Sequence, residues 1–356
     1  MTKRIGILTG GGDAPGLNAV IRAFVKHSVR EYQWEVIGIE DSFNGLFDSP
    51  RRLQKLDLRS CQGLLHRGGT VLGTTNRGNP FSFPMPDGSK ADRSAELVNA
   101  IREEGIDGLV CIGGDGTQAI AIRLMEECGV PVVGVPKTID NDLRVTDHCP
   151  GYGSAAKFVA SAFMGDDRDS AALPGVKINV VMGRDAGWLT AASVLGNTDP
   201  VDGPHLVYVP EVEFSTDQFL ADVSEIYGRL GRCQIAVSEG IRDNTGTSVI
   251  VALAEALGRE VERDSHGNAQ LSGTGALGDF LSDFLKAKMG VPNIRVRADT
   301  FGYLQRSFAG YASQIDRVEA RQCGRHAAQF AMSGDLDGSV AMKRVEGDEY
   351  KIEYVR

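Results

Sequence analysis

The sequence predicts an α/β protein built from two doubly wound, mainly parallel sheet domains. Short apolar segments recur along the chain and alternate with longer segments in which apolar residues have helical spacing. This pattern is typical of parallel sheets that carry helices on both faces. Several of the short segments end in a glycine-rich turn that opens a helix. The chain has 356 residues, which is longer than a chain usually organised around a single hydrophobic core, so we expect two domains.

The first half of the chain alternates strands, glycine turns and helices. Lys3 to Thr9 reads as a strand, a glycine turn follows over residues 10–16, and Leu17 to Val29 has apolar residues at helical spacing. Further strands are expected at Trp34 to Ile39, Leu109 to Ile112 and Pro131 to Val135, with a helix at Ser94 to Glu104. Residues 41–58 and 79–93 are polar or rich in proline and glycine, so we expect loops there.

The second half repeats the alternation, and a change of domain is expected near residue 150. The expected strands are Val176 to Met182, Leu206 to Val209, Gln234 to Val237 and Ile294 to Ala298, and the expected helices are Thr216 to Arg229, Gly275 to Met289 and Gln314 to Met332. The last segment, Val340 to Val355, reads as mixed strand and turn.

Composition and charge narrow the function classes. Hydrophobic content of 42% and charged content of 24% are those of an ordinary globular protein. A net charge of −9 offers no basic surface for nucleic acid or for an acidic membrane. No apolar stretch approaches the roughly 20 residues of a membrane helix, and the 6 cysteines are scattered without a CxxC pair. We therefore expect a cytoplasmic metabolic enzyme with reduced cysteines.

The turn after the strand at 109–112 combines glycines with a carboxylate. It reads GGDGT over residues 113–117, with Gly114 and Gly116 on either side of Asp115. Glycines let the backbone approach a ligand closely, and the start of the following helix offers free N–H groups to an anion. Asp115 can hold a hard cation such as Mg²⁺ beside phosphate oxygens.

A second chemical segment follows the next strand, in the sequence PKTIDND over residues 136–142. Asp140 and Asp142 occupy alternate positions, so on an extended segment both carboxylates point the same way. Lys137 and Thr138 precede them. A phosphate cradle, a cation ligand and a paired-carboxylate base site within one stretch are the parts of a phosphoryl-transfer site.

The glycine turn at residues 10–16 also follows a strand and opens a helix, which is a phosphate-binding arrangement. It lacks the Gly-Lys-Ser/Thr ending of a P-loop, and Pro15 stands where a G-x-G-x-x-G motif needs its third glycine. An ordinary dinucleotide site is therefore disfavoured.

Together these motifs resemble the phosphofructokinase family, the sugar-phosphate kinases of glycolysis. The resemblance rests on GGGDAPGLNAVIR (10–22), GGDGT, PKTIDND, MGRDAGW (182–188), SEG (238–240) and GYLQRS (302–307), which run in family order over roughly residues 3 to 330. It implies transfer of a phosphoryl group from Mg-ATP to the 1-hydroxyl of fructose 6-phosphate, in an active site between two domains. The implied domains are residues 1–150 with about 307–333 for the donor and 151–306 with about 334–356 for the sugar phosphate.

The resemblance also assigns roles to single residues. On the donor side it implies contacts from Gly12, Arg77, Gly114, Gly116, Thr117 and Lys137, with Mg²⁺ on Asp115. On the acceptor side it implies Asp140 as general base and Asp142, Thr138, Met182, Gly183, Arg184, Glu239, Arg297, Tyr303 and Arg306 as substrate ligands, with Thr138 and Arg184 also acting on the transferring phosphate. Arg297 is expected to reach a neighbouring subunit, so the resemblance implies a homodimer or homotetramer.

Three positions depart from the family pattern. Gly175 stands where many bacterial members have a phosphate-binding arginine, with only Lys177 nearby, and Tyr303 replaces a histidine. The two arginines of the usual effector site read Arg22 and Lys26. The acceptor and any allosteric control are therefore left open by the sequence.

The phosphoryl donor is the main alternative. Gly116 leaves room for the α-phosphate and ribose of ATP, where an aspartate would exclude them, whereas Lys137 is a feature of family members that use pyrophosphate. We expect ATP, with pyrophosphate as the alternative. An NAD kinase also carries GGDGT but has no place for MGRDAGW or GYLQRS, and a regulatory subunit without activity is disfavoured by Asp115, Asp140 and Arg184.

Overall fold

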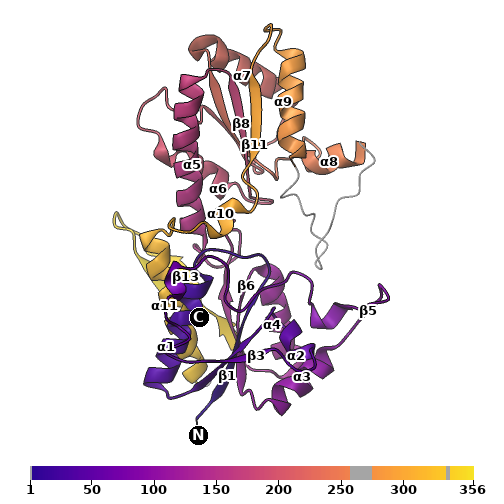
Figure 1. The fold of residues 1–356 in the computed structure, drawn as a ribbon, viewed down its shortest axis with the longest axis vertical. Helices are drawn as coiled ribbons and strands as arrows, with labels where there is room; N and C mark the ends of the chain where they lie inside the picture. The colour runs from indigo at the N-terminus through magenta and orange to yellow at the C-terminus, as the bar shows by residue number, and fades with distance from the viewer. Residues whose placement is uncertain (1, 257–274, 334–336) are drawn as a thin grey trace. The chain divides into compact units, whose positions relative to one another are not determined.

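The computed structural model describes residues 2–256, 275–333 and 337–356. Contacts divide these residues into two compact units (Figure 1). Unit 1 comprises residues 2–154 with 306–333 and 337–356, and unit 2 comprises residues 155–256 with 275–305. Of the second domain expected from the sequence, residues 257–274 and 334–336 lie outside the described residues.

Unit 1 is built on a 6-stranded sheet in the order β12-β7-β6-β1-β2-β3. Its strands are β1 (Arg4–Gly10), β2 (Glu35–Ile39), β3 (Leu53–Leu56), β6 (Gly108–Gly113), β7 (Val132–Pro136) and β12 (Asp337–Ser339). Only the pair of β2 and β3 is antiparallel. Gly10 pairs with Gly113, and Gly113 pairs with Pro136. The three strands that precede the phosphate-type motifs therefore end side by side at one edge.

Helices cover both faces of this sheet (Figure 1). They are α1 (Leu17–Glu31), α2 (Asn44–Phe47), α3 (Ser94–Glu103), α4 (Asp115–Cys128) and α11 (Gln314–Met332). The core between the sheet and α3 and α4 includes Leu97, Leu109 and Leu124, each fully buried. On the other face α11 packs closely against α1, because a Cβ on Gly324 would lie only 2.3 Å from the carbonyl oxygen of Val20.

The C-terminal tail belongs to unit 1, which corrects the expectation that residues 334–356 join the second domain. β12 adds a parallel strand beside β7, with Asp337 opposite Val132. β13 (Ala341–Arg344) and β14 (Ile352–Val355) then form an antiparallel hairpin. Because the first of these strands has the polar sequence DGS, its hydrogen bonds to β7 could not be inferred from an apolar pattern.

Unit 2 contains a 4-stranded parallel sheet in the order β11-β8-β10-β9. Its strands are β8 (Val176–Val181), β9 (Leu206–Tyr208), β10 (Cys233–Ser238) and β11 (Val296–Thr300), and its main helices are α5 (Tyr152–Ala172), which begins in unit 1, α7 (Thr216–Leu230), α8 (Val249–Ala256) and α9 (Ala276–Lys288). Phe219, Ile235 and Leu281 are fully buried in its core. Unit 2 also contains the short helices α6 (Trp188–Ala191) and η3 (Ala192–Gly196), and the chain passes from unit 2 to unit 1 within α10 (Leu304–Ser307).

The expected α/β class with mainly parallel sheets in two domains is confirmed. The two expected loops are only partly irregular. Residues 41–58 contain α2 and the antiparallel strand β3, and residues 79–93 contain η2 (Pro80–Ser82) and a small ribbon of β4 (Phe83–Pro84) with β5 (Lys90–Ala91). The short helix η1 (Leu64–His66) lies between these regions in the chain.

Candidate active site

The glycine turn after β1 and the segment before Arg77 form one hydrogen-bonded structure. The Gly11 N–H donates to the Thr75 carbonyl at 3.0 Å, and the Thr74 hydroxyl donates to the Gly11 carbonyl at 2.6 Å. Gly11 has φ +78°, a left-handed conformation that favours glycine. Arg77 lies at the end of this segment with an exposed side chain. The glycine turn of residues 10–16 and the glycine-containing segment of residues 67–77 are therefore neighbours in space.

Asp13, which the sequence analysis passed over, ties this structure together. Its Oδ1 accepts a hydrogen bond from the Thr70 N–H at 3.0 Å, and its Oδ2 accepts one from the Ser307 hydroxyl. The turn is thereby joined both to the segment of residues 67–77, through Thr70, and to the chain beside Arg306, through Ser307. The sequence signal that could have indicated this role is a carboxylate in the middle of a glycine turn, four residues before the start of α1.

Lys137 is almost completely buried beneath the glycine turn, with 3% of its surface exposed. Its ammonium donates to the carbonyl of Gly10 at 3.2 Å and to the carbonyl of Gly12. Burial, together with the nearby charge of Arg306, lowers the pKa of Lys137 to about 8, while Asp13 and Asp140 oppose the shift. Two acidic and two basic side chains thus act on one another at this strand edge.

Arg306 lies directly against the backbone of the glycine turn. A Cβ on Gly12 would be 3.0 Å from both Cζ and Nη1 of the guanidinium. The sequence placed Arg306 among the sugar-phosphate ligands, and the structure brings it to Gly12 and Lys137 in unit 1. An arginine here can offset negative charge next to the turn.

The GGDGT turn divides into an inward and an outward part. Thr117 is buried, with 6% of its surface exposed, and fills the space between the ends of β1 and β6. A Cβ on Gly10 would lie 2.5 Å from its Oγ1, and a Cβ on Gly113 would lie 2.4 Å from its Cβ. This side chain therefore packs between two strands, although a donor contact was expected from it.

Asp115 is exposed at the first position of α4, after the N-cap Gly114. Its Oδ1 accepts the N–H of Gly116 at 2.8 Å. The described residues contain no group of three or more His, Cys, Asp or Glu that could hold a metal ion. A single carboxylate fits Mg²⁺, which commonly binds through one or two carboxylates and completes its shell with phosphate oxygens and water.

The segment with the paired carboxylates leaves β7 as a tight turn. The Thr138 hydroxyl accepts the N–H of Asp140 at 3.0 Å, and Asn141 has φ +54°. Asp140 is half-buried and its charge raises the pKa of Lys137, so the two lie near each other. Asp142 is exposed, and its charge adds to the burial that raises the pKa of Cys149 to about 12.

In unit 2 the MGR and SEG motifs meet at the ends of β8 and β10, where Val181 pairs with Ser238. Met182 and Glu239 are buried, at 3% and 7% exposed, and the Ser238 hydroxyl donates to the Gly183 carbonyl. A Cβ on Gly240 would lie 2.0 Å from the carbonyl oxygen of Arg184. The two motifs are therefore packed backbone against backbone.

An ion pair missed by the sequence analysis adjoins this edge. The Asp185 carboxylate accepts the Arg242 Nη2 at 2.6 Å and lies 3.8 Å from the Arg184 Nε. Asp185 therefore lies between two guanidinium groups, one of which belongs to the predicted phosphate ligand Arg184.

The structure separates Arg297 from the other residues expected to bind the sugar. Arg297 pairs with Lys177 in the parallel strands β11 and β8, whereas Met182 follows the carboxyl end of β8. Five residues of strand separate Lys177 from Met182, a distance of about 16 Å at roughly 3.3 Å per residue. Tyr303 is exposed beyond the carboxyl end of β11. Within one chain, Arg297 and the MGR motif lie at opposite ends of the sheet.

The glycine at position 175 has a structural cause. Gly175 has φ +156°, and a Cβ on it would lie 2.6 Å from the carbonyl oxygen of Arg295. An arginine at this position would force the backbone apart. The departure from the family pattern is therefore built into the start of β8.

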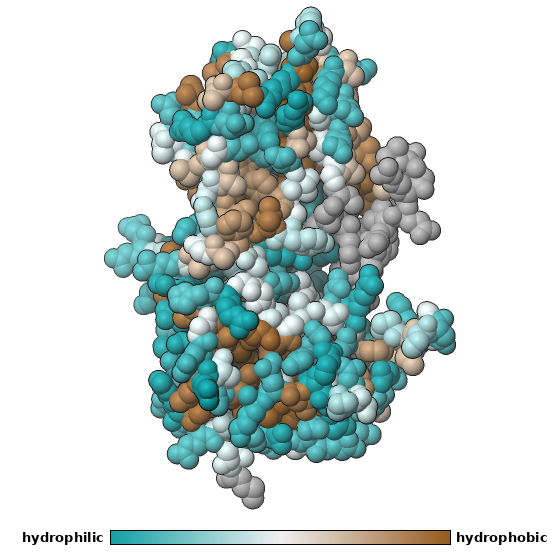
Figure 2. All heavy atoms as spheres, viewed as in Figure 1, coloured by the Kyte–Doolittle hydropathy of each residue, from teal (hydrophilic) through white to brown (hydrophobic). Residues whose placement is uncertain are grey.

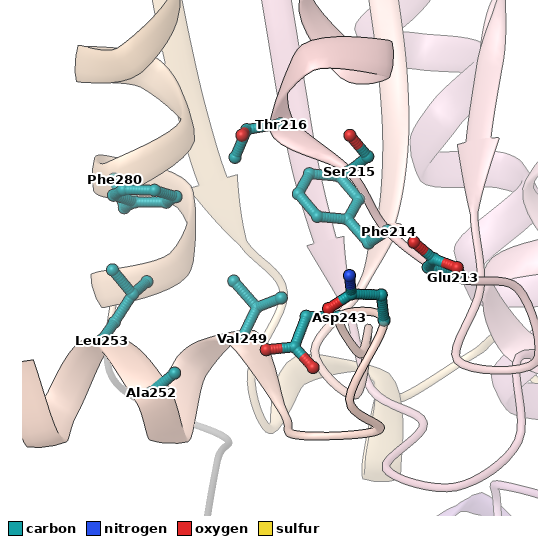
Figure 3. A pocket seen from close by; sticks show the side chains of 10 residues that line it. Glu213, Phe214, Ser215, Thr216, Asp243, Val249, Ala252, Leu253 and Phe280 are labelled. Carbon is teal, nitrogen blue, oxygen red and sulfur yellow. The ribbon is translucent and has the colours of Figure 1, made fainter.

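A cavity of about 370 Å³ lies elsewhere in unit 2, among α7, α8 and α9 (Figure 3). Apolar side chains line it together with two carboxylates, as in Phe214, Val249, Leu253, Phe280, Glu213 and Asp243. None of the residues expected from the sequence to bind substrate lines this cavity.

Residues 4–331 match the family model described as Phosphofructokinase. The chain belongs to the phosphofructokinase family. It is 50% identical over 264 residues to the pyrophosphate–fructose 6-phosphate 1-phosphotransferase of Rhodospirillum rubrum, an alignment that covers 73% of this chain and 63% of that relative. It is 38% identical to ATP-dependent 6-phosphofructokinase 1 of Nostoc sp., over 96% of this chain and 88% of that relative. Family relatives therefore carry both donor names.

Solved structures of this phosphofructokinase family share the fold. The pyrophosphate-dependent phosphofructokinase from Marinobacter aquaeolei has a TM-score of 0.78 at 24% identity and covers 99% of this chain and 82% of its own. The corresponding protein from Nitrosospira multiformis has a TM-score of 0.79 at 22% identity, with coverage of 99% and 83%. The family match spans every motif from the glycine turn to GYLQRS, which leaves the NAD kinase alternative without support. Among the described helices, none has the length and apolarity to cross a membrane.

Proposed function

We propose that this phosphofructokinase family member transfers a phosphoryl group from Mg-ATP to the 1-hydroxyl of fructose 6-phosphate, giving fructose 1,6-bisphosphate. The observation that carries the proposal is the cluster at the glycine turn of unit 1. Lys137 and Arg306 lie at Gly12, and Asp140 is close enough to affect the charge of Lys137. Basic side chains beside a glycine turn can stabilise the charge of a transferring phosphoryl group, and a nearby carboxylate can accept the proton of the attacking hydroxyl.

On the donor side, Gly12 presents backbone without a side chain, and the guanidinium of Arg306 beside it offsets phosphate charge. Arg77, Gly114 and Gly116 complete the proposed donor contacts. Asp115 would hold Mg²⁺, which neutralises charge on the donor phosphates when it is bound.

On the acceptor side, Asp140 takes the proton of the sugar hydroxyl as the new bond to phosphorus forms. The Thr138 hydroxyl fixes the turn by accepting the Asp140 N–H, at 3.0 Å, and Asp142 orients the sugar. In unit 2, Glu239 would accept sugar hydroxyls, and Arg184 would bind the transferring phosphate.

The geometry of Lys137 bears on the identity of the donor. Its ammonium is already committed to the carbonyls of Gly10 and Gly12, so its presence is explained by the shape of the turn whichever donor binds. Gly116 lies in the first turn of α4, directly after Asp115, and a residue without a side chain at this position would leave room for a nucleotide. These two considerations favour ATP.

Pyrophosphate is the second candidate, because a 50% identical relative is named for it and because Lys137 has a third N–H to offer a phosphate. The decisive experiment measures kcat/KM with fructose 6-phosphate for ATP and for pyrophosphate. We expect ATP to be preferred by at least tenfold. Turnover with pyrophosphate alone would overturn the donor assignment, and no turnover with either donor would overturn the proposed reaction.

Self-association belongs to the same proposal. Unit 2 exposes large apolar side chains, including Met164 at 50% and Leu195 at 73%, and Figure 2 shows apolar atoms on the visible face of this unit. Exposed apolar groups of this size suit a protein interface. A homodimer or homotetramer would also let Arg297 serve the sugar site of a neighbouring subunit. We further propose that the enzyme works in the cytoplasm.

A further inference from the structure

The segment that carries Asp140 and Asp142 continues without a helix or strand from residue 137 to residue 151. Its two ends are close together, because Thr138 forms a parallel bridge with Gly151. The Gly151 N–H donates to the buried carboxylate of Asp316, on α11, at 2.9 Å. The loop between these ends therefore needs support from elsewhere to hold a fixed shape.

That support comes from the C-terminal hairpin, residues 341–355. The Asp147 N–H donates to the Met342 carbonyl at 2.8 Å, and the Met342 N–H donates to the Thr146 hydroxyl at 3.1 Å. The Arg344 N–H donates to the Asp147 carboxylate at 2.8 Å. The loop is thus bound to β13 almost as a further strand, and the Asn141 amide donates to the Asp147 carbonyl at 3.1 Å. This last bond connects the support directly to the residue between the two carboxylates.

Glu319 of α11 joins the loop and the hairpin from below. It is buried, with 4% of its surface exposed. Its Oε2 contacts the His148 Nδ1, and its Oε1 accepts the Tyr350 hydroxyl at 2.5 Å. The His148 ring also packs edge-on against Tyr152, with ring centroids 5.3 Å apart. One buried carboxylate therefore holds a residue of the loop and a residue of the hairpin at once.

We propose that the C-terminal hairpin is a positioning element for Asp140 and Asp142, acting on their loop through His148 and Glu319. The inference rests on the proposed function, in which Asp140 is the base. A base must sit within hydrogen-bond reach of its proton, and displacement of a reacting group by about 1 Å can cost 10²-fold in rate. The hydrogen bonds named above join the hairpin to the loop and to α11, and none of them involves a residue expected to bind the donor. The hairpin can therefore set the geometry of the base independently of the donor phosphate.

The test compares His148→Ala with His148→Asn in the full-length enzyme. Asparagine keeps a nitrogen on Cγ, where the Nδ1 of histidine is attached, so it can still donate to Glu319. We expect His148→Ala to lower kcat about 10- to 100-fold, with KM for the donor changed less than about threefold. His148→Asn should recover most of the loss, and Tyr350→Phe, which removes only one donor to Glu319, should cause a smaller loss in the same direction.

Hydrogen exchange provides the readout that does not depend on catalysis. The amides of residues 139–147 should exchange faster in His148→Ala than in the wild type and His148→Asn, while amides of β1 and β6 stay unchanged. Equal exchange in all three proteins would overturn the proposal. A fall in kcat accompanied by an equally large rise in KM for the donor and by a fall in Tm would also overturn it. If the wild type lacks phosphotransferase activity, the proposed function fails, and the exchange comparison still decides whether the hairpin holds the loop.

Discussion

The two units place their basic side chains differently at the ends of their strands. In unit 1 Lys137 is buried beneath the glycine turn, whereas in unit 2 Arg184 is more exposed and its backbone is tightly packed. Lys137 has 3% of its surface exposed and donates to the glycine turn. The Arg184 side chain is 27% exposed. The backbone carbonyl of Arg184 packs against Gly240, where an added Cβ would lie 2.0 Å from its oxygen. The difference indicates that charge and turn shape are coupled in unit 1 and largely independent in unit 2.

The largest effect is expected from the base. Asp140→Ala should lower kcat by about 10²–10⁴-fold, because a positioned proton acceptor is lost. Glu239→Ala in unit 2 should mainly raise KM for the sugar phosphate, since that side chain is assigned to binding. Steady-state kinetics together with calorimetric binding of fructose 6-phosphate measure the contrast. A normal kcat in Asp140→Ala would remove Asp140 from the mechanism.

The next effect concerns the donor. Gly116→Asp places a second carboxylate next to Asp115 at the start of α4, and like-charge repulsion with the α-phosphate together with lost space should cost a few kcal/mol. We expect kcat/KM for ATP to fall by about 10²-fold, since 1.4 kcal/mol corresponds to tenfold, and activity with pyrophosphate to fall less. Gly116→Ala is the control for volume without charge. Unchanged use of ATP by Gly116→Asp would refute the steric argument.

Lys137→Met should affect both donors by a similar factor, about tenfold, because the carbonyls of Gly10 and Gly12 lose a donor. A change in donor preference instead would mean that Lys137 contacts the phosphate directly.

The pH dependence sharpens the same point. The pKa of Lys137 is lowered from 10.5 to about 8, chiefly by burial. The folded protein therefore releases this proton near pH 8, while the unfolded chain keeps it up to about pH 10.5. Between these values the unfolded state binds more protons, so this group favours folding increasingly as the pH rises. Activity should nevertheless decline above pH 8 with the loss of charge, and this decline should be absent in Lys137→Met.

The smallest effect is expected on stability, and a matched pair of glycines tests it. In Gly12→Ala the atoms nearest to the new Cβ belong to the flexible end of Arg306, at 3.0 Å, so stability should change little. In Gly240→Ala it meets the Arg184 carbonyl oxygen at 2.0 Å, and rigid backbone cannot yield without cost. We expect a loss of about 1–3 kcal/mol in the free energy of unfolding for Gly240→Ala alone. Urea unfolding of both variants measures it, and equal losses would contradict the contrast between the units.

Local patterns were sufficient for most of the fold and for the motifs. The apolar strands that end at Gly113 and Pro136, and the helices between them, follow from periodicity alone. What periodicity could not supply were contacts between distant segments. The role of Asp13 depends on its hydrogen bonds with Thr70 and Ser307. The polar segment β12 is recognised as a strand because it pairs with β7.

The site shows the same limit. Gly12 and Lys137 were both expected near the donor, yet the sequence did not reveal that Lys137 is buried and donates to the carbonyls of Gly10 and Gly12. The position of Arg306 against Gly12 depends on the path of the chain from β11 into α10, the short helix that carries Arg306. Thr117 looked like a ligand because it stands in a motif, and it packs between two strands because both strands end in glycine.

That packing has a consequence for how the family can vary. Thr117 occupies space that exists only because positions 10 and 113 carry no Cβ, each of which would lie within 2.5 Å of it. The three positions therefore share one fixed volume, and a larger residue at either glycine demands a smaller one at position 117. Homologous sequences should show these positions changing together, as a compensated set, even though position 10 lies more than a hundred residues before the other two.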